Sequence, residues 1–77
     1  MNQRDVLMQE FPELADALHE LPENVRLVDS DRSSAPARGL ETRITLYVEV
    51  DEKLYALSYT RFDNGFASVD TEELDPL

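Results

Sequence analysis

Apolar residues between positions 3 and 21 recur at the spacing of one face of a helix. They follow intervals of four, three, four and three residues: Leu7, Phe11, Leu14, Leu18 and Leu21. A proline inside a helix costs about 3 kcal/mol, whereas the first helical position tolerates it. Pro12 therefore divides the region into a helix over residues 3–9 and a second over residues 12–20, and Pro22 ends the second helix.

From residue 25 onward the pattern changes to the alternation of strands. Residues 43–50 alternate cleanly, with one face made of Ile44, Leu46, Val48 and Val50 and the other of Arg43, Thr45, Tyr47 and Glu49. Residues 53–62 predict the next strand, and residues 25–29 predict a shorter one. Residues 30–40 are rich in Ser, Pro and Gly and are interpreted as a loop.

The first hairpin has one favoured register. A two-residue loop at Asp51 and Glu52 places Val48 opposite Tyr55 and brings the large apolar side chains of both strands to one face. A slip by one residue would place apolar side chains opposite serine and threonine. The first register is therefore expected.

The second hairpin is indicated by Asn64-Gly65, the strongest short hairpin signal. A loop of three residues, with Gly65 in the left-handed region, places Val69 opposite Tyr59. A shorter loop would place Asp70 there, facing the core. The longer loop is therefore expected.

These elements predict an α+β fold, with one or two short N-terminal helices packed on one face of a three- to four-stranded antiparallel meander. With 77 residues, the chain is expected to form a single domain. Residues 1–23 are predicted to be helical, residues 24–70 to form the sheet with its loop at 30–40, and residues 71–77 to form an acidic tail.

The amount and the distribution of charge along the chain limit the kinds of partner that it is expected to bind. The net charge is −10, and it is concentrated in residues 1–23 and 63–77, whereas residues 24–62 are neutral. Direct nucleic-acid binding and binding to an anionic membrane both require clustered bases, so neither is expected. The excess of acids, the single lysine and the lack of Cys and Trp resemble, in composition only, proteins of salt-loving archaea. A GC-rich genome would give the same arginine excess.

Residues that could carry chemistry are few. The chain has no cysteine and one histidine, His19, interpreted as a surface residue. Asp29-Ser30-Asp31 has a hint of calcium-loop spacing but lacks the glycine and the closing glutamate of that loop. No glycine-rich phosphate loop is present. We therefore expect no catalytic residue, no metal, no cofactor and no enzyme activity, and, without a visible export signal, a cytoplasmic location.

Two surfaces remain as candidates for binding. One is an acidic helix stripe, predicted to dock a basic protein: Glu13, Asp16, Glu20 and Glu23. The other is the outer face of the sheet, where Tyr47, Phe62 and Phe66 are predicted to support self-association as a homodimer.

The leading hypothesis is a small acidic non-enzymatic protein that acts through protein contacts, with a composition that would suit adaptation to high salt. A nucleic-acid-mimicking inhibitor of a basic protein, of the phage type, is the alternative. An RNA-binding sheet is a second, weaker alternative. A mimic should be acidic on one patch, whereas a salt-adapted surface should be acidic all over.

Overall fold

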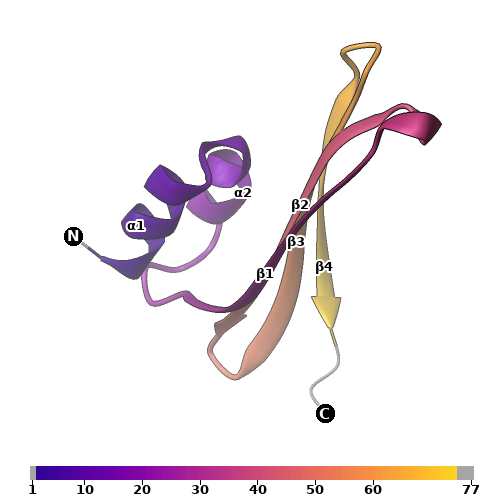
Figure 1. Cartoon of the computed structure of the whole chain (residues 1–77). Coiled ribbons are helices and arrows are strands. Elements are labelled where there is room, and N and C mark those ends of the chain that lie inside the picture. The colour runs from indigo at the N-terminus through magenta and orange to yellow at the C-terminus, as the bar shows by residue number, and fades with distance from the viewer. Residues whose placement is uncertain (1, 75–77) are drawn as a thin grey trace.

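The computed structural model describes residues 2–74 and confirms the predicted α+β class. Short helices precede an antiparallel sheet of four strands, which lie in the order β1-β2-β3-β4 (Figure 1). The elements are α1 (Gln3–Glu10), the 3-10 helix η1 (Pro12–Leu14), α2 (Ala15–His19), β1 (Arg26–Ala35), the 3-10 helix η2 (Pro36–Arg38), β2 (Leu40–Val50), β3 (Lys53–Phe62) and β4 (Ala67–Leu74). Because each strand pairs with its neighbour in sequence, the sheet is a meander.

The two helices begin where their sequences provide a start. The Asn2 side chain accepts a hydrogen bond from the backbone N–H of Asp5 at 2.8 Å, which caps α1. Pro12 opens the next helical segment, as predicted, although the first turn is η1 and α2 follows it directly. The chain between α1 and η1 changes direction at Phe11, so the segments form two short rods instead of one long helix.

The core lies between the helices and one face of the sheet. Its members are mostly leucine, isoleucine and valine side chains: Leu7, Leu14, Ala17, Leu18, Val25, Ile44, Leu46, Val48, Val50 and Leu57. Leu14, Leu18, Ile44, Leu46 and Leu57 have no exposed surface. The helical stripe and the alternating face of the strands therefore seal a common interior, as the sequence predicts.

The register of the first hairpin is confirmed. Val48 pairs with Tyr55, and the same alignment continues to Arg61, which lies opposite Thr42. The register then shifts by one residue, so that Phe62 pairs with Leu40. Asp51 and Glu52 form the turn with φ values of 51° and 65°. Positive φ at both central residues is typical of the type I′ turn, whose twist matches that of the flanking strands.

The second hairpin also has the predicted alignment. Val69 pairs with Tyr59. Gly65 adopts a φ of 90°, and the backbone N–H of Phe62 donates to the carbonyl oxygen of Phe66 at 2.8 Å. The loop therefore begins after Phe62, which leaves apolar Val69 and not Asp70 on the face of Tyr59.

The predicted loop at residues 30–40 is wrong over most of its length. β1 continues to Ala35 and pairs with β2, so only residues 36–39 connect the strands. An edge strand needs a hydrogen-bonding neighbour on one side only, and polar side chains are tolerated where no helix covers them. The chain turns where Pro36 opens η2 and Gly39, with a φ of 77°, follows it.

The predicted acidic tail at residues 71–77 is also corrected. β4 extends through Leu74 and pairs with β3, so residues 71–74 belong to the sheet, whereas residues 75–77 lie outside the described part of the chain. The hydrogen bonds offered by β3 outweigh the low strand propensity of two consecutive glutamates.

Candidate functional site

Among residues 2–74, no layer covers one face of the sheet. The helices lie on one side of the sheet, and the opposite side, called here the outer face, is open (Figure 1). The two central strands contribute mainly small polar side chains to it, including Thr45, Ser58 and Thr60. Together with Tyr47 and part of β4 they line a shallow groove of about 490 Å³.

Carboxylates follow both edges of the outer face. On β1, Asp29 lies opposite Tyr47 and Asp31 opposite Thr45, so both share the face of those residues. On β4, Asp70 and Glu72 pair with Ser58 and Ala56 and lie on the same face. These four exposed residues, called here the acidic margins, are Asp29, Asp31, Asp70 and Glu72.

Few bases balance the acidic margins. Arg26, at one end of the face, forms an ion pair with Glu49 at 2.8 Å. Arg43 lines the groove and takes part in none of the ion pairs found within residues 2–74. The outer face therefore carries a net negative charge, with one available guanidinium in the groove.

The aromatic residues predicted for the outer face occupy two places. Tyr47 lies in the groove and is half-buried. Phe62 and Phe66 lie together at the β3–β4 turn, with ring centroids 6.2 Å apart, and Phe66 remains 62% exposed. The three side chains therefore do not form one continuous aromatic surface, and their role in self-association stays a prediction.

The acidic helix stripe lies on the other layer of the molecule. Glu13, Asp16, Glu20 and Glu23 are all exposed on the helical segments and the turn that follows them. Asp70 and Glu72 point away from the helical layer, because they share the outer face. Asp70 and Glu72 thus do not join the helix stripe, whereas Glu73 lies on the helix side of the sheet, 3.7 Å from Lys53.

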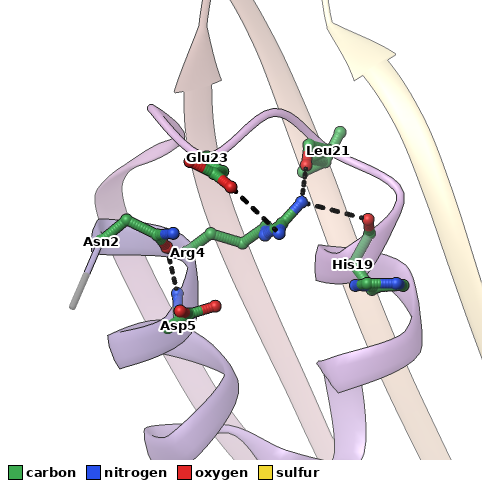
Figure 2. A network of polar contacts seen from close by, with 6 residues as sticks. All are labelled: Asn2, Arg4, Asp5, His19, Leu21 and Glu23. Atoms are coloured by element: carbon green, nitrogen blue, oxygen red, sulfur yellow. Dashed lines mark hydrogen bonds and ion pairs between the residues drawn. The ribbon is translucent and has the colours of Figure 1, made fainter.

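Arg4 is a residue whose role the sequence does not reveal. Its guanidinium reaches from α1 across to the end of α2 and the segment that follows, where it donates to the carbonyl oxygens of His19 at 3.4 Å and Leu21 at 2.9 Å (Figure 2). Glu23 lies 3.9 Å from the same guanidinium. The Arg4 side chain is only 17% exposed, and its Nε is buried without a hydrogen-bond partner. Arg4 thus ties the two helices together while partly neutralising the helix stripe.

The carboxylates of residues 2–74 do not assemble into a metal site. No group of three or more potential metal ligands occurs among these residues. Asp29 and Asp31 lie on a strand, not on the loop that the calcium-like spacing would require. His19 is exposed, as expected.

Comparisons with other proteins give no further guidance. No family model matches the chain, and searches of curated proteins and of solved structures found no match. Within the described residues, no helix has the length and apolar character needed to cross a membrane. The two surfaces themselves are therefore the features from which a function can be inferred.

Proposed function

We propose that this chain is a small non-enzymatic protein that acts by binding a basic protein partner, and that the outer face is its contact surface. The observation that supports this proposal is the arrangement of the acidic margins on both sides of a groove that contains Tyr47. Tyrosine is enriched at protein interfaces because it offers apolar area and a hydroxyl group on one rigid ring. Carboxylates at the rim of such a face attract a basic surface and orient it.

A basic partner fits this face better than a second copy of the chain. In a two-fold dimer built face to face, the edge strands of one copy oppose edge strands of the other. Both edges of the outer face are acidic, so carboxylates would meet carboxylates in either orientation. Like charges directly opposite one another destabilise such contacts. Self-association through Tyr47 and Phe66 is therefore expected only where salt screens the repulsion.

The nucleic-acid-mimicking inhibitor receives less support. A decoy for one basic groove gains most from carboxylates on one side of the molecule. The helix stripe and the acidic margins lie on opposite layers. Charge spread over both layers is also what a protein adapted to high salt would carry.

The test compares two variants with the same change in net charge. The first replaces three residues of the acidic margins, as Asp31→Asn, Asp70→Asn and Glu72→Gln. The second replaces three residues of the helix stripe, as Glu13→Gln, Asp16→Asn and Glu20→Gln. A lysine-rich synthetic peptide serves as the probe, and its affinity is measured by calorimetry at low and moderate KCl.

We expect the margin variant to weaken binding by about tenfold or more, which corresponds to about 1.4 kcal/mol. The stripe variant should change the affinity far less, because its carboxylates lie on the other layer. Equal losses in both variants would show that only total charge matters and would reject the outer face as the contact surface. A larger loss in the stripe variant would instead favour the helices as the docking site.

A further inference from the structure

The β4 strand presents unpaired backbone groups along one side. In an antiparallel pair, residues that exchange hydrogen bonds alternate with residues that do not. Phe62 donates to Phe66 across the β3–β4 pair, which sets this alternation along the whole of β4. Val69, Thr71 and Glu73 therefore direct their N–H and C=O groups away from β3. Because β4 is the last strand of the sheet, no described strand pairs with them.

β4 is the more regular of the two edge strands. The pairing of β1 with β2 is interrupted twice, between Leu27 and Asp29 and between Ser33 and Ala35. The pairing of β4 with β3 runs without interruption from Leu74 to Ala67. Bulges, prolines and charged side chains, lysine above all, are the usual features that prevent an edge from accepting another strand. Between residues 67 and 74, β4 has no bulge, no proline and no lysine, so its three carboxylates are its only such feature.

The side chains of β4 select against a second copy of the same strand. Asp70 and Glu72 lie on the outer face, and Glu73 lies on the other face with its carboxylate 3.7 Å from Lys53. Two β4 strands paired edge to edge would bring these carboxylates together. A strand with lysine or arginine at alternate positions would instead form opposite-charge cross-strand pairs, each worth about 0.2–1 kcal/mol.

We propose that β4 accepts an extended basic segment of the partner as a fifth strand of the sheet. Main-chain hydrogen bonds to Val69, Thr71 and Glu73 would hold the segment, as in other cases of strand addition. Asp70 and Glu72 select its basic side chains on the outer face. Val69 is 47% exposed and gives an apolar contact on the other face. This inference rests on the proposed function, because it specifies how the basic partner is held.

The first test removes one outward-facing backbone donor. Thr71→Pro deletes the N–H of Thr71, which β3 does not use, and proline is tolerated on an edge strand when its missing N–H faces solvent. Thr71→Val keeps that N–H and is the matched control. The probe is a short peptide that alternates lysine with valine. We expect Thr71→Pro to weaken its binding by about tenfold or more and Thr71→Val to leave it nearly unchanged.

A second measurement does not depend on the folding of the proline variant. The same peptide carrying N-methyl groups on its valines cannot donate to β4 while its lysines lie on the outer face, so its binding to the unmodified chain should be lost. Amide hydrogen exchange should slow at Val69, Thr71 and Glu73 when the unmethylated peptide is added. The amides of Asp70 and Glu72 already face β3 and should change little.

The outcomes separate this inference from the proposed function. Binding that the margin variant weakens, but that Thr71→Pro and N-methylation leave intact, would overturn strand addition and keep the outer face as the contact surface. No binding of any lysine-rich peptide would reject both. Protection of the β4 amides that grows with protein concentration, without peptide, would identify a second copy as the occupant and overturn the inference.

Discussion

The guanidinium of Arg4 donates a hydrogen bond to the carbonyl oxygen of Leu21 at 2.9 Å, across the gap between the start of α1 and the segment that follows α2. The last carbonyls of a helix have no partner within it, and arginine side chains are suited to satisfy them. His19, the last residue of α2, offers the second carbonyl oxygen, 3.4 Å from the same guanidinium, so Arg4 contacts both the end of this five-residue helix and the segment after it.

Replacement of Arg4 by methionine should lower the free energy of unfolding by about 1–3 kcal/mol. Hydrogen bonds from charged donors contribute about 1.5–3 kcal/mol, and loss of the unpartnered Nε offsets part of that. The matched control is Arg26→Met, which also removes one positive charge but breaks an ion pair whose side chains are 58% and 45% exposed. Such pairs contribute about 0.2–1 kcal/mol. Urea unfolding measures both, and equal losses would mean that Arg4 is no more than a surface charge.

The turn between β2 and β3 offers a stabilising substitution. Glu52 adopts a φ of 65°, a left-handed conformation that costs a residue with a side chain about 1–2 kcal/mol. Glycine adopts it without this cost but loses more entropy on folding. We expect Glu52→Gly to raise the unfolding free energy by about 0.5–1 kcal/mol.

Two further variants control for the charge and for the backbone. Glu52→Gln removes the charge but keeps the side chain, so it should give a smaller gain than Glu52→Gly. Gly65→Ala tests the same physics in reverse, because Gly65 has a φ of 90° and an added Cβ would meet no atom within 4 Å. Its destabilisation, about 1 kcal/mol or more, would come from the backbone alone. If Gly65→Ala were as stable as the unmodified chain, backbone strain at a positive φ would not explain the expected gain at Glu52 either.

The fold was predictable wherever side chains must choose between core and solvent. The leucine stripe predicts the helices, and the alternation from Ile44 to Val50 fixes which face of β2 is buried. Register follows because one slip would expose every apolar side chain of that face. Both hairpin alignments are therefore encoded locally.

The parts of the fold that were not predictable are the C-terminal halves of the two edge strands, β1 and β4. Residues 30–35 and 71–74 carry almost no apolar alternation, because neither of their faces is covered over most of that length. Their strand conformation depends on hydrogen bonds from β2 and β3, which a local pattern does not contain. The acidic margins were missed for the same reason, although the spacing by two residues of Asp29/Asp31 and Asp70/Glu72 is what a strand requires to place both on one face.

Because the helices and the sheet share one core, truncation of Leu18 should destabilise both of them together. Leu18 has no exposed surface, and a buried leucine changed to alanine costs about 2–5 kcal/mol. Small domains have total stabilities of about 5–15 kcal/mol, so Leu18→Ala should lose a large share. Val6→Ala is the control, because Val6 is 41% exposed and surface changes cost about 0.5 kcal/mol or less. If circular dichroism showed the helices melting while the sheet stayed folded, the shared core would be disproved.

Salt should stabilise this protein strongly. All acidic residues described by the structure are exposed except Asp5 and Glu49, which are half-buried. Only four of the described acids take part in ion pairs: Glu23, Glu41, Glu49 and Glu73. The remaining carboxylates, on both layers, repel one another, and molar salt shortens the screening length to about 3 Å.

The melting temperature should therefore climb as KCl rises from low to molar concentration, by about 4–8 °C for each kcal/mol of repulsion removed. The helix-stripe variant with Glu13→Gln, Asp16→Asn and Glu20→Gln has less repulsion to screen. It should melt higher than the unmodified chain at low salt and show a shallower dependence on KCl. Differential scanning calorimetry measures both slopes. A melting temperature that stays flat or falls as KCl rises would rule out repulsion as the limit on stability and, with it, adaptation of this surface to high salt.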